Sequence, residues 1–472
     1  MNKNLHKSIQ ITPIDYHQDL ASNVFNHIQH KPWAMFLHSS SKEHVDSRYD
    51  ILVTDPVVTL TTKQTITQVM TPDGDFDSEK DPFDLLATLQ QQYLPDIKTI
   101  SESTSSSKRD EGLNLPFVGG AVGYFSYDLG RRIETLPNLA SDDIGMPEMV
   151  VGLYEWALLV DHKTSSAYIV GERASEHWQQ LQSQVNNEPK STPFQLTSPW
   201  SSNMTKQSYS DKFNSVQDYL LSGDCYQINL AQRFQANYEG CEWQAYKKLE
   251  SYNLAPFSAF IRTSEGAILS VSPERFLKVV DRVIETKPIK GTRPRSSDEK
   301  IDEANAEALL NAEKDQAENL MIVDLLRNDI GRVATPGSVN VPKLFDIESF
   351  PAVHHLVSTI RANLDEQYSN ADLLKACFPG GSITGAPKVR AMEIIEELEP
   401  HRRSAYCGSI GYISRDGTMD TSITIRTLVA KNSSLYAWAG GGVVADSECD
   451  SEYQETLDKL SRILPVLESN SE

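Results

Sequence analysis

The first half of the chain carries the pattern of β-strands. Apolar, β-branched runs bounded by turn residues predict strands over residues 33–37, 51–54, 117–124 and 150–160. None of these runs approaches the length of a membrane span. We therefore expect a strand-rich N-terminal part that folds in water.

The second half mixes helical and strand periods. Thr205 is a predicted N-cap, because apolar residues at helical spacing follow it. Long helices are predicted near residues 299–328, 385–398 and 450–469. Strands are predicted at residues 259–262, 268–271, 409–413 and 421–429. Without strict βαβ alternation, this order predicts an α+β fold of mostly antiparallel sheets covered by helices.

Two polar stretches interrupt the pattern. Residues 98–112 are too polar to bury and predict a surface loop or a disordered insert. Residues 185–204, rich in Pro and Ser, predict a connector. The chain is therefore expected to divide into residues 1–200 and residues 201–472.

Charge and cysteine usage narrow the class of protein. The 472 residues include 44 Lys plus Arg and 65 Asp plus Glu, a net charge of −21, which disfavours binding to nucleic acid. The five cysteines stand at no zinc or redox spacing, so we expect reduced thiols. No apolar signal core follows the N-terminal Met. We expect a cytoplasmic protein without a membrane segment.

Two acidic helices are candidates for metal binding. Asp315 and Glu318 are three residues apart and share a helix face, as do Glu452 and Glu455, with Lys459 one turn beyond. Two such pairs could hold Mg²⁺, which prefers oxygen ligands. A solvated acidic helix face would produce the same spacing.

Other residues are candidates for anion binding and proton transfer. The glycine-rich segments 378–388 and 439–443 can bring backbone N–H groups close to a carboxylate or a phosphate. Arg426 is expected to point with Ser422 and Thr424 to one face of a strand, as a carboxylate ligand or a surface residue. His355, in an apolar run, could be a donor or a core histidine.

Lys290 stands between a proline and a glycine, sixteen residues after Glu274. A hairpin could join the two as nucleophile and acid. The alternative is a solvated lysine in a basic turn, since Lys287, Arg293 and Arg295 are close in sequence. If near in space, these cations would favour the free amine.

These segments together resemble the chorismate-utilising enzymes, whose fold is that of anthranilate synthase component I, a sandwich of large antiparallel sheets flanked by helices. The resemblance covers essentially the whole chain and is strongest in the second half. Its motifs are residues 225–234, 272–276, 288–292, 324–329, 381–388 and 452–456. It implies that residues 201–472 form the chorismate-binding catalytic region, with residues 1–200 packed closely on it.

The resemblance also implies site roles. Glu318 and Glu455 would bind Mg²⁺ directly, and Asp315 and Glu452 would do so through water. Glu274 would be the general acid that helps the 4-hydroxyl leave. The ring would lie beside His355, and the substrate's carboxylates would be held by Tyr406, Arg426, Gly440, Gly442 and Lys459.

Two positions indicate a branch of this family. Anthranilate synthases look like Pro-Ile-Ala-Gly in the motif where this chain has Pro-Ile-Lys-Gly, with Lys290 in place of the alanine. Isochorismate synthases carry a water-activating lysine at the position where this chain has Gln227. The branch implied is the one that makes 4-amino-4-deoxychorismate for 4-aminobenzoate and folate, a transaminase-class amination of chorismate by ammonia. Lys290 would attack ring carbon 2, and ammonia would then displace it by adding at carbon 4.

Partners and rivals follow from the same resemblance. The cysteines lack a Gly-x-Cys-x-Gly elbow, which implies a separate glutamine amidotransferase subunit that supplies ammonia. Bound tryptophan stays open, in a pocket of Leu37, Ser39, Pro256 and Ser258. The alternatives are an anthranilate synthase large subunit and a catalytically silent, tryptophan-binding regulatory subunit. The joint presence of the acid, the lysine and the metal carboxylates opposes the second.

Overall fold

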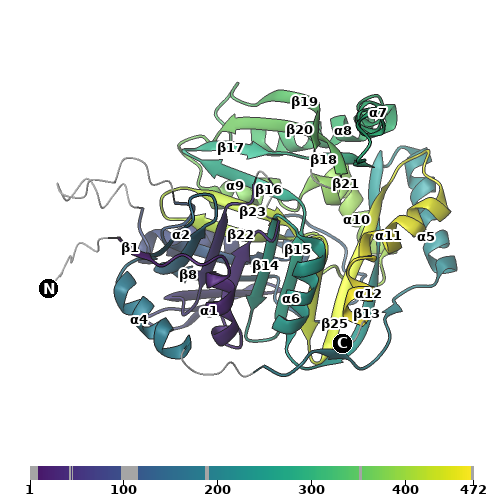
Figure 1. Cartoon of the computed structure of the whole chain (residues 1–472). Helices are drawn as coiled ribbons and strands as arrows, with labels where there is room; N and C mark the ends of the chain where they lie inside the picture. The colour runs from purple at the N-terminus through teal and green to yellow at the C-terminus, as the bar shows by residue number, and fades with distance from the viewer. Residues whose placement is uncertain are drawn as a thin grey trace.

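A computed structural model describes residues 9–41, 44, 46–96, 115–185, 191–349 and 353–468. The polar segment 98–112, predicted as a loop or insert, lies outside these ranges. Within them, two large sheets of antiparallel strand pairs pack together, with helices around them (Figure 1). The predicted α+β fold of antiparallel sheets is confirmed.

The first sheet has 13 strands among the described residues. Its strands, in order across the sheet, are β1 (Gln10–Ile14), β10 (Ser166–Gly171), β9 (Trp156–Asp161), β3 (Tyr49–Val53), β2 (Met35–His38), β14 (Phe257–Arg262), β15 (Ala267–Ser272), β24 (Thr427–Lys431), β25 (Ser434–Val443), β13 (Gln227–Glu239) and β11 (Gln195–Leu196), with β12 (Ser201–Ser202) and β21 (Gly385–Ala386) also paired to β13. The predicted connector therefore contributes β11 and β12 to this sheet.

The second sheet has 12 strands among the described residues. In order, they are β18 (Ile289–Pro294), β20 (Val353–Asn363), β17 (Val283–Thr286), β16 (Arg275–Val280), β23 (Met419–Ile423), β22 (Ser409–Ser414), β7 (Gly120–Phe125), β8 (Met149–Tyr154), β4 (Val58–Lys63), β5 (Ile66–Met70) and β6 (Phe76–Ser78), with β19 (Asn340–Ser349) paired to β20. Both sheets draw strands from residues 1–200 and from residues 201–472.

The helices lie around the two sheets (Figure 1). They are α1 (Leu20–Ile28), α2 (Pro82–Tyr93), α4 (Ala174–Val185), α5 (Lys206–Ser222), α6 (Glu242–Asn253), α7 (Glu299–Leu310), α8 (Glu313–Gly331), α9 (Asn370–Cys377), α10 (Lys388–Leu398), α11 (Cys449–Leu460) and α12 (Leu464–Glu468), with 3₁₀ turns η1 (Tyr127–Arg132) and η2 (Gly381–Ile383). In the described part of the chain, no helix is long and apolar enough to span a bilayer.

The N-cap of α5 is as predicted, because the Thr205 hydroxyl accepts the Ser208 N–H at 3.1 Å. Two single predicted helices are wrong. Residues 299–328 lie in α7 and α8, with a break at Asn311–Ala312. The helix predicted near residues 450–469 is divided into α11 and α12, and its last residue lies outside the described ranges. Helical periodicity continues across each break, so the apolar pattern alone does not reveal it.

Two single predicted strands are also wrong. Residues 150–160 divide at Glu155 into β8 and β9, and residues 421–429 divide after Ile423 into β23 and β24. In each case the chain leaves the second sheet and enters the first. The chain passes the other way between β15 and β16, at Pro273–Glu274. Each segment is buried nearly throughout, so its apolar run continues through the bend.

The sandwich has two apolar layers. One layer fills the space between the sheets, where Ile51 and Ile261 of the first sheet belong to the same cluster as Leu60 and Leu277 of the second. The other lies between the first sheet and its outer helices and includes the fully buried Trp243 of α6. Helices thus cover one face of the first sheet, while its other face meets the second sheet.

Candidate functional site

Glu274 and Arg426 lie where the chain passes between the sheets. The Ile423 N–H donates to the Glu274 carbonyl at 3.0 Å, and the Val271 N–H donates to the Arg426 carbonyl at 3.1 Å. The two crossings are therefore tied to each other by backbone hydrogen bonds. They bring an acid and a guanidinium from distant parts of the sequence to one region.

The expected strand geometry of Arg426 is wrong. Arg426 follows the end of β23 and has a φ of +50°, so it does not continue the alternation of Ser422 and Thr424. Its side chain is partly buried, and within the described ranges no carboxylate acts on it. Burial is the main cause that lowers the pKa of the Arg426 guanidinium, and the positive charge of Arg462 lowers it further. An unpaired guanidinium in such a place is suited to an anionic ligand.

Glu274 is half-buried, and two cations act on its carboxyl group. Burial raises its pKa, and Lys290, a hydrogen bond from Ser382 and Lys459 act in the opposite direction. The Ser382 hydroxyl donates to Glu274 Oε1 at 3.1 Å. Ser382 belongs to the predicted glycine-rich segment 378–388, so that segment reaches the acid through a side chain.

Lys290 is positioned by a bulge in β18. The pairing of β18 with β20 shifts between Lys290 and Thr292, and Gly291 between them has a φ of +79°. A Cβ on Gly291 would lie 2.7 Å from Asp315 Cγ, so the bulge packs tightly on α8. Lys290 Nζ lies 3.8 Å from Glu318 Oε2 on that helix.

The basic residues around Lys290 have their own carboxylate partners. The nitrogen–oxygen distances are 2.8 Å for Lys287–Glu348, 3.3 Å for Arg293–Asp315 and 2.8 Å for Arg295–Asp302. Their positive charges are largely compensated, so they do not surround the Lys290 amine with uncompensated charge.

His355 lies across from this bulge on β20. Its Nδ1 is 2.9 Å from the Thr292 hydroxyl. Burial lowers the pKa of its imidazole to about 4, and the nearby Arg426 acts in the same direction, while a hydrogen bond with the Gly291 backbone opposes both. His355 is therefore a neutral residue at neutral pH.

The two acidic helices bring their carboxyl groups to the same region. Burial raises the pKa of Glu318 on α8, and the carboxyls of Asp315 and Glu452 add to that rise. Burial also raises the pKa of Glu452 on α11, which accepts a hydrogen bond from Ser447 at 2.6 Å. Lys459 Nζ lies 2.6 Å from Glu455 Oε1. Like-charged carboxyls thus face one another across two helices.

The carboxylate oxygens of α8 and α11 are of the ligand type that a hard divalent cation prefers. Among the described residues, no three acidic, His or Cys side chains form a complete ligand cluster. Mg²⁺ usually takes only one or two carboxylates and fills its octahedron with water and substrate oxygens. The mutual repulsion of Glu318 and Glu452 is a second feature that a divalent cation would relieve.

The triple-glycine run of β25 lies against α11. Lys459 Nζ donates to the Gly440 carbonyl at 2.9 Å. A Cβ on Gly441 would lie 2.8 Å from Glu452 Oε2, so any larger residue there would displace the carboxylate. On the neighbouring part of the strand, Tyr406 stacks on Trp438 with ring centroids 6.2 Å apart.

One residue of segment 378–388 points elsewhere. Lys388 Nζ lies 2.5 Å from Asp329 Oδ2 and donates to the Cys377 carbonyl at 3.1 Å. It is thus committed to a buried ion pair. The segment contributes Ser382 to the site, but it does not contribute its lysine.

Comparison with known proteins decides the family. The family model described as "chorismate binding enzyme" matches residues 36–465. This chain belongs to that family. Aminodeoxychorismate synthase component 1 of Salmonella typhimurium is 54% identical over 470 residues, covering 99% of this chain and 100% of that protein. The Escherichia coli protein of the same name is 54% identical over 456 residues, covering 96% and 97%.

The fold of this chorismate binding enzyme also matches solved structures. Anthranilate synthase component I from Streptococcus pneumoniae superposes with a TM-score of 0.75 at 30% identity, covering 95% of this chain and 99% of that one. The resemblance inferred from the sequence motifs is therefore confirmed at the level of family and fold.

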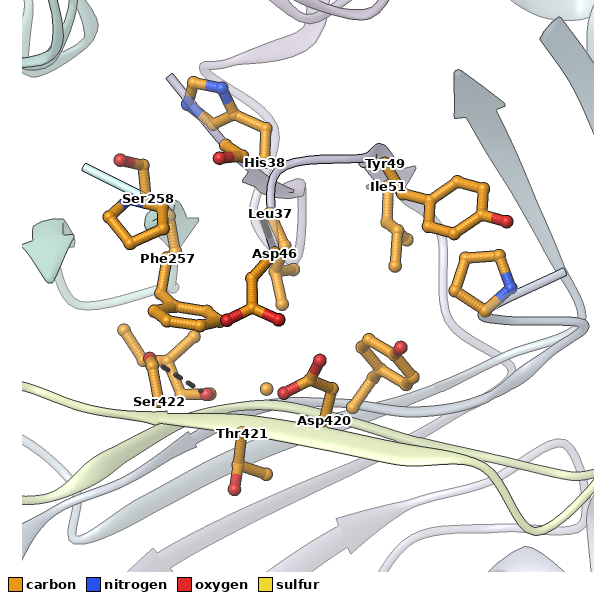
Figure 2. Close-up of a pocket in the computed structure, with 17 residues that line it drawn as sticks. Leu37, His38, Asp46, Tyr49, Ile51, Phe257, Ser258, Asp420, Thr421 and Ser422 are labelled. Carbon is orange, nitrogen blue, oxygen red and sulfur yellow. Dashed lines mark hydrogen bonds between the residues drawn. The ribbon is translucent and has the colours of Figure 1, made fainter. Parts of the chain in front are cut away.

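A cavity lies between the sheets of this chorismate binding enzyme, apart from the candidate catalytic residues described above. Figure 2 shows it between β2 and β14 on one side and β23 on the other. Leu37, Ser39, Pro256 and Ser258, the four residues expected around a tryptophan, all line it. Asp46 and Asp420 also line it (Figure 2), and Arg275 binds both carboxylates, at 2.7 and 2.9 Å.

Sequence reasoning missed several residues that shape the site. Ser382 lies within the predicted glycine-rich segment 378–388, where nothing in the sequence distinguishes it from its neighbours. Arg403, which is fully buried, donates to the carbonyls of Ile383 and Asn229 at 3.0 and 2.7 Å. It thereby fixes the glycine-rich segment to β13. An arginine in a polar stretch gives no sequence signal for such a role.

Proposed function

We propose that this enzyme converts chorismate and ammonia to 4-amino-4-deoxychorismate, in the route to 4-aminobenzoate and folate. The observation that carries the proposal is Lys290, held by the Gly291 bulge with its amine 3.8 Å from Glu318, in a chain 54% identical over its length to aminodeoxychorismate synthase component 1. A solvated surface lysine would have neither the bulge nor the half-buried Glu318 carboxylate nearby.

The proposed reaction has two displacement steps. The neutral amine of Lys290 forms a bond to ring carbon 2, the two ring double bonds shift, and the bond from carbon 4 to its hydroxyl breaks. Glu274 gives that hydroxyl a proton, and it leaves as water. Ammonia then bonds to carbon 4, the double bonds shift back, and the bond from carbon 2 to Nζ breaks. A proton from the added ammonia restores Glu274.

The partial burial of Glu274 supports its role as the acid. Burial raises the pKa of its carboxyl, which keeps a larger protonated fraction near neutral pH than an exposed glutamate has. The Ser382 hydrogen bond fixes the orientation of the carboxyl. Glu274 therefore supplies the proton, while Ser382 positions it.

Magnesium is part of the proposal. Glu318 and Glu455 would hold the ion directly, with Asp315 and Glu452 behind them through water. When bound, Mg²⁺ supplies Lewis-acid polarisation and a template for the ring carboxylate of chorismate. The substrate's carboxylates are further held by Arg426, Tyr406, Lys459 and the backbone at Gly440 and Gly442. His355, neutral at neutral pH, lies beside the ring as a hydrogen-bonding group.

We further propose that the ammonia comes from a separate glutamine amidotransferase subunit. The name of the relatives, component 1, implies a second component. The cysteines of this chain are isolated, and Cys225, Cys241, Cys377 and Cys407 are buried. The purified chain is expected to use ammonium salts, but not glutamine, as the nitrogen source.

The product identifies the reaction. Incubation with chorismate, MgCl₂ and ammonium chloride is expected to give 4-amino-4-deoxychorismate by liquid chromatography and mass spectrometry. Formation of fluorescent anthranilate without an added lyase would identify an anthranilate synthase instead. Absence of any turnover would favour the silent regulatory subunit.

A further inference from the structure

Two carboxamides on β13 have buried oxygens that accept no hydrogen bond from the part of the chain that the structure describes. Gln227 and Asn229 are 1% and 8% exposed. The Oε1 of Gln227 and the Oδ1 of Asn229 are both buried, and neither has a partner among the residues that the structure describes. An unsatisfied buried acceptor costs about 1–3 kcal/mol, so a pair of them indicates that a donor is missing.

The two carboxamides face the glycine run of the site. Alternate residues of a strand point to the same side, so Gln227 and Asn229 share a face of β13. A Cβ on Gly442 would lie 2.1 Å from Gln227 Nε2, and one on Gly440 would lie 2.7 Å from Asn229 Oδ1. Both carboxamides therefore lie directly over the two glycines, on the opposite face of β25 from Gly441 and its acidic helix.

Asn229 is also fixed relative to the acid. Its N–H donates to the Thr384 carbonyl at 2.8 Å, and its carbonyl accepts Arg403 Nη2 at 2.7 Å. Two residues before Thr384, the Ser382 hydroxyl binds Glu274. The strand that carries the carboxamides is thus held to the same short segment that orients the general acid.

We propose that Gln227 and Asn229 form the site that holds ammonia before it attacks the ring. This inference rests on the proposed function. Chorismate carries two carboxylates and only one hydroxyl. Its single hydrogen-bond donor is the hydroxyl that Glu274 protonates in the proposed reaction, so chorismate has no further donor for the two carboxamide oxygens. Ammonia offers three N–H donors and one lone pair, which matches two acceptor oxygens on one side and a free lone pair for attack.

Neutral carboxamides suit this task better than carboxylates. A carboxylate beside ammonia would favour the ammonium ion, whose nitrogen has no lone pair. A carboxamide accepts an N–H without exchanging a proton, so the lone pair stays available. Each carboxamide can also present its oxygen by a half-turn of the terminal group.

Near-isosteric apolar variants test the inference. Asn229→Leu and Gln227→Met keep the side-chain volume and remove the acceptors. With the full chain, chorismate and MgCl₂, initial rates are measured against ammonium chloride at fixed pH, and against chorismate at saturating ammonium. We expect each variant to raise the KM for ammonia about five- to tenfold, with the KM for chorismate within about twofold of the wild type.

The matched control is Asn237→Leu, farther along the same strand. Asn237 is exposed, and its Oδ1 already accepts the Ser434 hydroxyl at 3.0 Å. Both kinetic constants should match those of the wild type. Thermal unfolding of each variant and calorimetric titration with chorismate show whether the fold and substrate binding are preserved.

The outcomes are separable. If the KM for chorismate rises as much as that for ammonia, the carboxamides bind the substrate and the inference is overturned. Unchanged constants in both variants would overturn it as well. If the wild type makes no 4-amino-4-deoxychorismate, the proposed function fails first, and this inference fails with it.

Discussion

Lys290 has its position fixed by backbone geometry, which sets its amine at the long end of ion-pair distance from Glu318. The Gly291 bulge and the packing on Asp315 leave its amine 3.8 Å from Glu318. We predict that Lys290→Ala lowers kcat by on the order of 100-fold or more, the scale typical for loss of a catalytic group. Some activity can remain, because ammonia can partly replace the amine.

Mass spectrometry checks this prediction. Wild-type enzyme treated with chorismate and MgCl₂ without ammonia should carry an adduct on Lys290, and the variant should not. Lys287→Ala is the control, since Lys287 pairs with Glu348. Equal activity of the Lys290 variant and the wild type would rule out the covalent route.

The protonation state of the Glu274 carboxyl affects both the proposed catalysis and the stability of the fold. Burial raises the pKa of the Glu274 carboxyl in the folded state above its pKa in the unfolded state. The charged carboxylate therefore destabilises the folded state at a pH above the folded-state pKa. At a pH below the unfolded-state pKa the carboxyl is protonated in both states, and this destabilisation is absent. We predict that Glu274→Gln raises Tm by roughly 1–2 °C at pH 8, but not at pH 4. Its kcat should fall about 100-fold or more.

The pH–rate profile gives the second readout for Glu274. With a protonated acid required, the wild-type kcat should decline as pH rises through the raised pKa of this carboxyl. The residual activity of Glu274→Gln should lack that decline. A variant profile identical to the wild type would exclude Glu274 as the acid.

Two features of the bulge favour glycine at position 291: its positive φ and the lack of space for a Cβ beside Asp315. Alanine at a φ of +79° is strained by about 1–2 kcal/mol, and its Cβ would also meet Asp315 Cγ at 2.7 Å. Gly337 has a φ of +78° with open space around its Cβ position. We predict that both alanine variants lose similar stability in urea unfolding, or more for Gly291→Ala, but that only Gly291→Ala loses most of its activity. Comparable kcat values would show that the packing of the bulge is not critical.

At the scale of elements, one buried ion pair holds β13 to the glycine-rich segment. Arg403 is paired with Glu399 at 2.6 Å, and Glu399 accepts the Ala231 N–H at 2.9 Å. We predict that Arg403→Met destabilises the protein by about 3–5 kcal/mol, because it leaves a buried carboxylate unpaired. Urea unfolding measures this loss.

The double variant Arg403→Met, Glu399→Gln separates charge from packing. It removes the unpaired carboxylate and keeps an acceptor for Ala231. We expect it to recover a substantial part of the lost stability. If it is no more stable than Arg403→Met, the hydrogen bonds of Arg403 to Asn229 and Ile383 account for the cost.

At the scale of the whole molecule, the cavity between the sheets joins the two halves of the sequence. Leu37 comes from β2, and Pro256 and Ser258 come from 219 and 221 residues farther along. We propose that tryptophan binds there. L-Tryptophan at about 100 times its Kd should stabilise the fold by about 2.7 kcal/mol and raise Tm accordingly.

Differential scanning fluorimetry checks this expectation. Leu37→Trp fills part of the cavity and should abolish the shift in Tm while keeping turnover of chorismate, since it lies outside the catalytic residues. L-Phenylalanine is the ligand control. If tryptophan leaves Tm unchanged, the cavity is not its site.

Local sequence patterns predict many of the helix ends and strand segments. Thr205 caps α5 as expected, and the strand segments near residues 33–37 and 268–271 lie in strands β2 and β15. These features depend on residues close together in the chain. The two strands predicted as single, over residues 150–160 and 421–429, fail because burial on both sides hides the point at which the chain changes sheets.

The sequence by itself determined the family, the fold class and the identity of the candidate residues, because short motifs and local periodicity depend on neighbours in the chain. Only the tertiary structure decided how those residues meet. The two sheet crossings bring Glu274 to Arg426, and the bulge sets Lys290 beside Glu318. Strand β13 places two carboxamides over the glycines, and their oxygens have no partner among the described residues. Such contacts join residues far apart in sequence, whose approach is fixed by packing and not by local pattern.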